Sequence, residues 1–198
     1  IIQSSKWRYF KKSLRPRDFF LAHTDLMGSV ATRASLLVNF FIKLPPVKLF
    51  LDLFFRIPSE RRFPKYARGS FLAWYKKHRA EQEAFAERAV YFPGCYVNYN
   101  NHELGKDVVT VLNAMNIGVI VSYEKCCGVP LIANGYIDRA RKNALLNINS
   151  LAASAAESGA RIISASSSCS FALKHEYRNL LELDNSAIFD RLEYITRV

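Results

Sequence analysis

The chain has 198 residues, half of them hydrophobic, which is enough for one ordinary domain and an additional region. Its formal net charge of +11 lies entirely in residues 1–90, which hold 18 Lys and Arg against 7 Asp and Glu, whereas residues 91–198 hold 10 of each kind. This asymmetry indicates two regions with different partners. The chain has only four cysteines and is too rich in core residues for a disulfide-stapled secreted miniprotein, so we expect reduced thiols.

Residues 1–87 are basic and aromatic, and we expect them to be mainly helical and amphipathic. Thr24 or Asp25 is a candidate helix N-cap, and Gly28 is a candidate helix breaker. Residues 61–78 continue the basic, aromatic character but contain no nucleic-acid recognition motif. The basic, aromatic composition of residues 1–87 therefore predicts docking to a membrane or to another subunit. We expect no nucleic-acid partner.

The most hydrophobic segment of the chain is residues 36–58, which Pro45 and Pro46 divide into two short helical pieces. Neither piece approaches the roughly 20 apolar residues that a helix needs to cross a bilayer. Both pieces carry Lys or Arg among Leu and Phe, so both are able to lie flat on a membrane surface. Docking on another subunit and packing on the chain's own domain explain the same pattern, and all three interpretations stay open at this point.

Residues 88–198 alternate between short apolar runs and amphipathic segments, which is typical of strands joined by crossover helices. We predict strands at residues 88–93, 117–122 and 161–165, and helices at residues 102–115, 136–158 and 170–181. Gly159 is placed to end the second of these helices. The sequence therefore predicts an α/β fold with a parallel, Rossmann-like sheet. The first strand is not followed by the G-x-G-x-x-G pattern of a dinucleotide site.

The four cysteines follow the ends of the three predicted strands. Cys95 follows the first strand, Cys126 and Cys127 follow the second, and Cys169 follows the third. Because the carboxyl ends of parallel strands share one edge of a sheet, loops that are distant in sequence meet there. We therefore expect the four thiols to converge on one site.

Four converging thiols suit an iron–sulfur cluster or zinc, since soft sulfur ligands favour both. Structural zinc is usually held by C-x-x-C pairs, and this sequence has none, so an iron–sulfur cluster is the favoured interpretation. Gly94 and Gly128 allow close backbone approach, the serine run from Ser166 offers hydroxyls, and helices starting after the cysteines would direct N–H groups to an anionic site. Buried unliganded thiols, or a redox dithiol of Cys126 and Cys127, are the alternatives.

At these residues the chain resembles a known family. The spacing of Cys95, the C-C-G sequence at residues 126–128 and Cys169 is similar to that of the cysteine-rich CCG domain, which the B subunits of heterodisulfide reductases share with lactate-utilisation proteins. The resemblance implies that residues 88–198 are a CCG domain holding an iron–sulfur cluster, with an ordinary 4Fe–4S cluster as the expected type. The implied ligands are Cys95, Cys126, Cys127 and Cys169.

A narrower resemblance covers nearly the whole chain. The blocks F-F-L-A-H-T-D-L-M-G-S-V, P-K-Y-A-R-G-S-F-L-A-W-Y, G-C-Y-V-N-Y-N and E-K-C-C-G-V-P-L-I-A-N-G are similar to the C subunits of anaerobic glycerol-3-phosphate dehydrogenases. The resemblance implies an electron-transfer subunit without catalytic residues of its own, peripheral on the cytoplasmic face of the inner membrane. It also implies that electrons come from flavin-containing catalytic subunits, which oxidise glycerol 3-phosphate, and pass toward the quinone pool.

Two features depart from that family. The CCG pattern usually closes with C-x-x-C, and here Ser166 stands at the first position of that pair. Family members also carry ferredoxin-type cysteine motifs upstream and a second CCG domain downstream, so we expect this chain to be an internal part of a longer protein. A hypothesis from another functional class is a non-redox anchoring or assembly module whose cysteines are structural or bind zinc.

Overall fold

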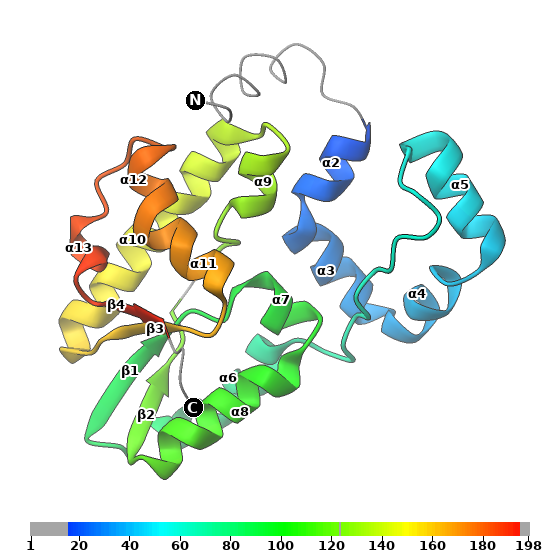
Figure 1. The fold of residues 1–198 in the computed structure, drawn as a ribbon. Helices are drawn as coiled ribbons and strands as arrows, with labels where there is room; N and C mark the ends of the chain where they lie inside the picture. Colours follow the sequence, from blue (N-terminus) through cyan, green and yellow to red (C-terminus); the bar gives the residue numbers. More distant parts are fainter. Residues whose placement is uncertain (1–15, 123, 195–198) are drawn as a thin grey trace.

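The computed structural model describes residues 16–122 and 124–194 of the chain (Figure 1). The first part of the predicted N-terminal region, residues 1–15, lies outside the described residues. Within the described ranges one sheet has the strand order β2-β1-β3-β4, and every neighbouring pair is parallel. The predicted α/β fold with a parallel sheet is confirmed. Its strands are β1 (Glu87–Tyr91), β2 (Ile117–Ile120), β3 (Ile162–Ser164) and β4 (Leu192–Tyr194).

Helices on opposite faces of the sheet join the first three strands. α8 (His102–Ala114) runs from β1 to β2, and α10 (Ile137–Ser158) runs from β2 to β3, both close to the predicted bounds. Gly159 ends α10 in the left-handed conformation at φ +65°, as predicted. Because the strand order is β2-β1-β3, the winding direction reverses at β1. Ligands of open α/β sheets bind at the carboxyl edge beside such a reversal.

Strand residues alternate between two cores, as the pleat of a sheet requires. Val90 and Ile162 belong to the core that includes α10, whereas Ala89, Tyr91 and Ile163 belong to the core that includes α8. All five side chains are at most 7% exposed, so both faces of the sheet are covered. The strands are therefore rigid supports for the loops that follow them.

α6 (Phe71–Gln82) covers the outer edge of β2. The Tyr75 hydroxyl donates to the Val119 carbonyl at 2.7 Å and accepts from the Val121 N–H at 3.2 Å. Gln82 Oε1 accepts from the Val119 N–H at 3.0 Å. These bonds satisfy backbone groups that would otherwise stay open at a sheet edge. Phe71 and Tyr75 also pack in the core that includes α8, so α6 is part of the sheet's own packing, while the division of the chain at residue 88 stays a prediction.

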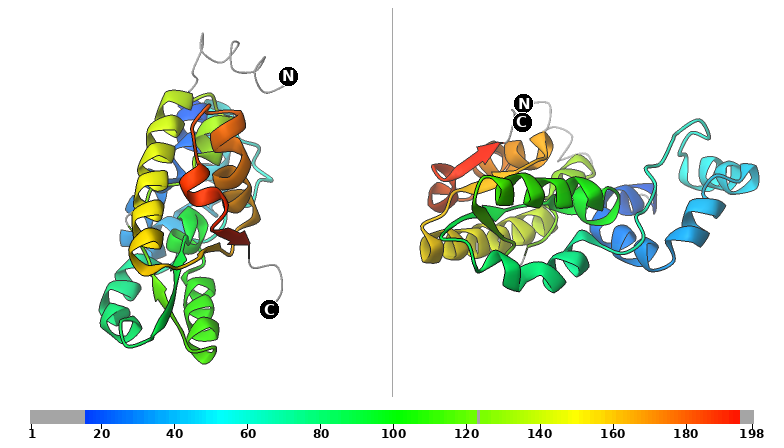
Figure 2. Two further views of the ribbon diagram at one scale, coloured as in Figure 1. Left: turned by 90° about the vertical axis from the view of Figure 1, so that its left-hand side faces the viewer. Right: turned by 90° about the horizontal axis from the view of Figure 1, so that it is seen from below.

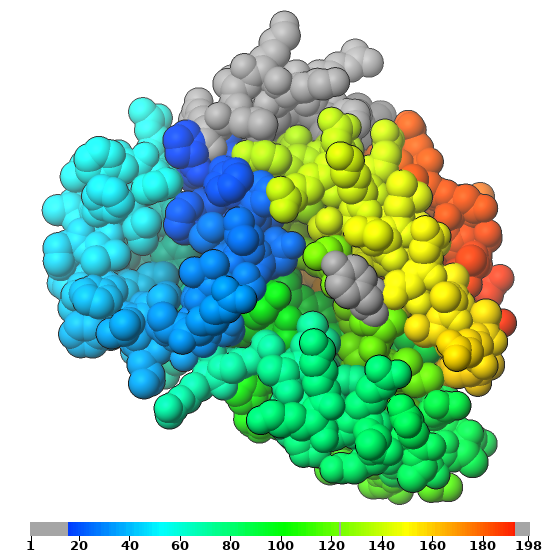
Figure 3. Space-filling view, turned by 180° about the vertical axis from the view of Figure 1, so that it is seen from behind, coloured from blue at the N-terminus to red at the C-terminus, as the bar shows by residue number. Residues whose placement is uncertain are grey.

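The described N-terminal region consists of short helices, and the two helical pieces predicted on either side of Pro45 are confirmed. α4 and α5 project from the rest of the molecule (Figures 1 and 2). α2 and α3 lie between this projection and α10 (Figure 3), with α2 packed against α9 (Val129–Ala133) and α3 against α7 (Gly94–Tyr99). Among the described residues, no helix has the length and apolar character of a membrane span. The bounds are α2 (Pro16–Ala22), α3 (Thr24–Arg33), α4 (Ser35–Phe41) and α5 (Pro45–Phe55).

The prediction that Gly28 breaks a helix is wrong. α3 continues through Gly28, which lies against Tyr99, and a β-carbon at this position would lie 2.5 Å from Tyr99 Cδ2. The glycine therefore allows α3 to approach α7 closely. The N-cap position is held by His23, directly before the predicted candidate Thr24.

The helix predicted at residues 170–181 begins earlier, at Ser167. Ser166 caps this start because its hydroxyl accepts a hydrogen bond from the Cys169 N–H. α11 (Ser167–Phe171), a π-helical segment (Ala172–Glu176) and α12 (Tyr177–Asn179) then follow one another without interruption. The serines at residues 166–168 therefore do not form a loop. Serine is a favoured N-cap residue, so a run of serines also fits the start of a helix. α7, α9, α13 (Ser186–Phe189) and β4 are further elements that the sequence did not predict.

Candidate metal centre

All four cysteines lie at the carboxyl edge of the sheet. Cys95 lies in the first turn of α7, after β1, and Cys169 lies in α11, after β3. Cys126 and Cys127 lie in the loop between β2 and α9. β2, β1 and β3 are neighbours in the sheet, so the three loops share one edge. The structure therefore brings together all four residues that the sequence singled out.

The four thiols interact with one another. Cys95 Sγ lies 3.8 Å from Cys126 Sγ, within hydrogen-bonding distance for thiols. The Cys126 and Cys169 thiols both act on Cys127 and raise its pKa. The Thr24 hydroxyl, which comes from α3, lies 3.7 Å from Cys95 Sγ. The N-terminal region thus supplies one wall of the site.

Mutual hydrogen bonds lower the pKa of two of the thiols, and mutual hydrogen bonds together with burial raise the pKa of the other two. Cys126, Cys127 and Cys169 are 5%, 3% and 6% exposed, and Cys95 is partly buried. Hydrogen bonds from Cys127 and Cys95 hold the pKa of Cys126 well below its usual value, and a hydrogen bond from Cys127 lowers the pKa of Cys169. The hydrogen bond with Cys126, together with burial, raises the pKa of Cys95 and of Cys127. Cys126 and Cys169 are therefore the first to ionise, and the thiolate is the form that binds metal.

Two glycines hold the backbone close to the thiols, as predicted. Gly94 has φ +70°, and a β-carbon there would lie 2.8 Å from Cys169 Sγ. Gly128 has φ +95°, directly after Cys127, and its N–H hydrogen-bonds the Cys126 thiol. Both φ values lie in the region that side chains other than glycine rarely adopt. The turns beside the sulfurs therefore depend on glycine.

Two asparagines of α10 fix the loop that carries Cys126. Asn147 is completely buried, and its Oδ1 accepts from the Lys125 N–H at 2.7 Å. Asn147 Nδ2 donates to the Lys125 carbonyl at 3.2 Å and to the Tyr177 hydroxyl at 2.9 Å. Asn143 Nδ2 donates to the Cys126 carbonyl at 3.4 Å. Sequence reasoning missed both residues, although their spacing of four places them on one face of α10.

The expectation that each helix starts after its cysteine is confirmed only for α9, which begins at Val129. Cys95 and Cys169 lie inside the first turns of α7 and α11. The reason at Cys169 is the cap at Ser166, which moves the start of α11 ahead of the thiol. The hydroxyl of Ser166 is thereby engaged with the backbone.

The donor set fits a metal cluster, and the sulfurs stand as hydrogen-bonded thiols. Four thiols from three loops are the soft ligands that iron–sulfur clusters and zinc both take. Among the described residues, no group of three or more His, Cys, Asp or Glu side chains is arranged to hold a metal ion. Cys95 and Cys126 are in direct contact, so the sulfurs must separate before several iron atoms fit between them.

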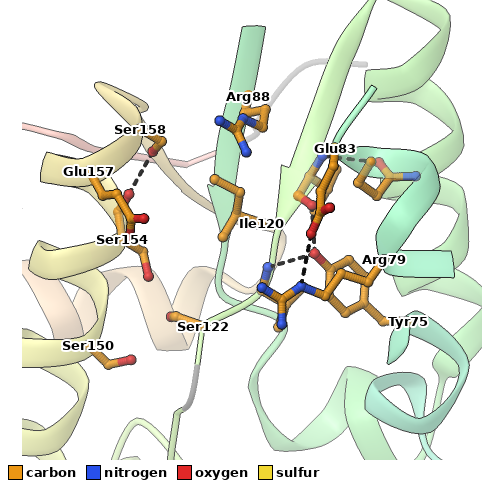
Figure 4. A pocket seen from close by; sticks show the side chains of 13 residues that line it. Tyr75, Arg79, Glu83, Arg88, Ile120, Ser122, Ser150, Ser154, Glu157 and Ser158 are labelled. Carbon is orange, nitrogen blue, oxygen red and sulfur yellow. Dashed lines mark hydrogen bonds and ion pairs between the residues drawn. The ribbon is translucent and has the colours of Figure 1, made fainter. Parts of the chain in front are cut away.

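A cavity of about 330 Å³ opens beside the thiols and is lined by Cys95, Cys126, Glu124 and Arg139, among other residues. A second cavity of about 310 Å³ lies near β2, between α6 and α10 (Figure 4). There Arg79 pairs with Glu83 at 3.5 Å, and none of the described residues that line this cavity is a cysteine. The first cavity therefore opens onto two of the four thiols, Cys95 and Cys126.

Residues 89–174 match the family model of the cysteine-rich domain called CCG. The chain contains a CCG domain. Over all 198 residues the chain is 45% identical to the C subunit of the anaerobic glycerol-3-phosphate dehydrogenase of Escherichia coli K12, and it spans 50% of that protein's length. The chain is also 40% identical over 52 residues to an uncharacterized iron-sulfur protein of Methanococcus maripaludis; the match covers 26% of this chain and 10% of that protein.

Both resemblances drawn from the sequence, to the CCG domain and to the C subunits of the anaerobic dehydrogenases, are confirmed by these matches. The homologous protein of Escherichia coli O157:H7 gives the same 45% identity over all 198 residues. No solved structure gives a significant match. The chain spans about half the length of the C subunits that it matches.

Proposed function

We propose that the chain is the iron–sulfur, electron-transfer part of an anaerobic glycerol-3-phosphate dehydrogenase complex. The observation that carries the proposal is the convergence of four thiols from three strand-end loops in a chain similar over its whole length to the C subunit of that enzyme. The cluster ligands are Cys95, Cys126, Cys127 and Cys169, and the cluster is of the 4Fe–4S type. Such a cluster supplies reversible one-electron transfer when it is bound.

The protein's own groups prepare this site in three ways. Burial of Cys126, Cys127 and Cys169 excludes water from the sulfurs. The lowered pKa values of Cys126 and Cys169 make thiolates available. Asn147 holds the loop before Cys126 in one conformation through its bonds to Lys125. These features support a site that binds and positions a cluster.

Oxidation of glycerol 3-phosphate belongs, in this proposal, to a flavoprotein partner, and the chain relays electrons toward the quinone pool. The chain's similarity to the C subunit of the Escherichia coli enzyme supports this place in the complex.

Metal analysis and low-temperature EPR of anaerobically purified protein test the cluster. We expect iron and sulfide in the wild type, and their loss in Cys126→Ala and Cys169→Ala, because alanine offers no ligand atom. Ser168→Ala is the matched control, since Ser168 is exposed beside Cys169 and should leave the iron content unchanged. A folded wild type that holds zinc or no metal contradicts the cluster and favours the anchoring module.

We place the chain peripherally on the cytoplasmic face of the inner membrane. The exposed surface of α4 and α5 supports this position. Residues 33–62 hold six Lys and Arg against two Asp and Glu, which suits anionic head groups. No described residue of α5 is buried. The apolar side chains that are at least half exposed on these two helices are Leu36, Leu37, Phe40, Phe41, Leu49, Phe50, Leu53 and Phe54.

Flotation with vesicles that contain anionic phospholipid tests the membrane proposal. We expect Leu53→Asp with Phe54→Asp to lose binding, because these side chains are 69% and 70% exposed and would enter the acyl boundary. Met115→Asp is the control, since Met115 is 64% exposed at the end of α8, away from α4 and α5. Binding that survives the double change rejects the membrane surface and leaves a protein partner for α4 and α5.

A further inference from the structure

Glu124 has a buried carboxyl group to which the described residues offer no hydrogen-bond partner. It lies in the loop between β2 and α9, two residues before Cys126. Both of its carboxyl oxygens are buried, and neither forms a hydrogen bond with any described residue. Burying a carboxyl group without a hydrogen bond costs several kcal/mol or forces it to stay neutral. A native fold retains such a group where the group has a task.

The surroundings of Glu124 point toward the thiols. Glu124 lines the same cavity as Cys95 and Cys126. The negative charge of Cys169 acts on Glu124, and the charge of Glu124 acts on Tyr91, whose buried hydroxyl also has no described partner. The carboxyl group therefore shares a cavity with the thiols of two of the three loops, and its oxygens are buried.

Ser166, another oxygen-bearing side chain beside the thiols, differs from Glu124 in being engaged. Its hydroxyl accepts from the Cys169 N–H at 3.5 Å and forms the cap of α11. The carboxyl oxygens of Glu124 are among the buried acceptors near the thiols that the described residues leave open, together with the hydroxyls of Tyr91 and Ser170. Carboxylate oxygen is an established ligand of protein-bound iron, as in sites with two histidines and one carboxylate.

We propose that Glu124 is a fifth protein ligand of the metal centre, donating a carboxylate oxygen to one iron of the cluster. This inference rests on the proposed iron–sulfur function. On assembly an Fe–O bond forms and the carboxyl proton leaves to solvent, with no change of oxidation state. One iron would then carry a carboxylate oxygen in addition to its cysteine thiolate, unlike the other three. Replacing thiolate ligands by a different donor changes the reduction potential, as histidine does in Rieske centres.

Mössbauer spectroscopy and redox titration of the whole chain, loaded with iron and sulfide under anaerobic conditions, test the proposal. In the wild type we expect an iron subsite whose isomer shift exceeds that of the sulfur-ligated irons. Glu124→Gln should abolish this subsite and shift the reduction potential. Glu124→Cys should keep the iron content and remove the oxygen-ligated subsite. Glu103→Gln is the control, because Glu103 is exposed on α8 and pairs with Lys106.

The outcomes separate this inference from the proposed function. A wild type without iron and sulfide overturns both. A wild type with a cluster, and spectra unchanged in Glu124→Gln, overturns the ligand role alone. Loss of iron from both Glu124 variants, with circular dichroism showing folded protein, also overturns it, because a thiolate at this position should replace the carboxylate. Loss from Glu124→Gln with retention in Glu124→Cys supports it.

Discussion

Gly94→Ala tests whether the close approach of α7 to Cys169 shapes the metal centre. The residue has φ +70°, and a β-carbon would lie 2.8 Å from Cys169 Sγ. The left-handed conformation costs an alanine about 1–2 kcal/mol. A forced contact in a packed site adds about 1–3 kcal/mol. We therefore expect the metal-free protein to lose about 2–5 kcal/mol of unfolding free energy, and the loaded protein to retain less iron.

Gly159→Ala is the matched control for this change. Gly159 has φ +65° at the end of α10, and a β-carbon there would meet no atom within 4 Å. The substitution therefore carries only the backbone cost of about 1–2 kcal/mol and should leave iron binding intact. Urea denaturation followed by circular dichroism, under reducing anaerobic conditions, gives both free energies. Equal losses of stability in the two variants, with equal iron content, would refute the role of the contact with Cys169.

Three further changes follow from the same contacts. Asn147→Ala removes the bonds to Lys125, so we expect about 2–4 kcal/mol less stability and weaker iron retention; full iron content in a destabilised variant contradicts the role in positioning. Tyr75→Phe leaves the Val121 N–H without its acceptor and should cost about 1–3 kcal/mol in thermal or urea unfolding, with iron content unchanged. Burial raises the pKa of Glu124 above 4.5, so the folded state keeps a proton that the unfolded state releases. Stability of the metal-free protein should therefore fall as pH rises above about 4.5, by at most about 1.4 kcal/mol per pH unit, until the folded-state pKa is reached. Glu124→Gln should flatten this dependence in urea titrations across that range, and an unchanged slope counts against the raised pKa.

The sheet and the meeting of the cysteines were predictable because both follow from local patterns. Apolar runs and helical periodicity give the order of strands and crossover helices, and parallel topology then brings Cys95, Cys126 and Cys169 to one edge. The caps were less predictable, since serine favours both loops and helix starts. Ser166 shows this ambiguity, because the run that it opens begins α11.

The residues around the thiols were not predictable, because their roles arise from tertiary contacts. Thr24 reaches Cys95 across 71 positions of the chain, and Asn147 reaches Lys125 across 22. The sequence pattern does not single out Glu124. Its role is inferred from the burial of its carboxyl group and the lack of a hydrogen-bond partner among the described residues, and both are known only from the structure. Gly28 was mispredicted for a similar reason. Glycine is common both at helix ends and where a helix packs closely against a neighbour, and only the structure shows that Gly28 packs against Tyr99.

α6 limits how the CCG domain can be exchanged between proteins. The segment that matches the family model begins at residue 89, after α6 has ended. A gene fragment cut at that point would encode β2 without Tyr75 and Gln82, leaving Val119 and Val121 with open backbone groups. Strands with open edges pair with other chains and aggregate. In this chain the stable unit is therefore longer than the matched segment, because it includes the helix before it.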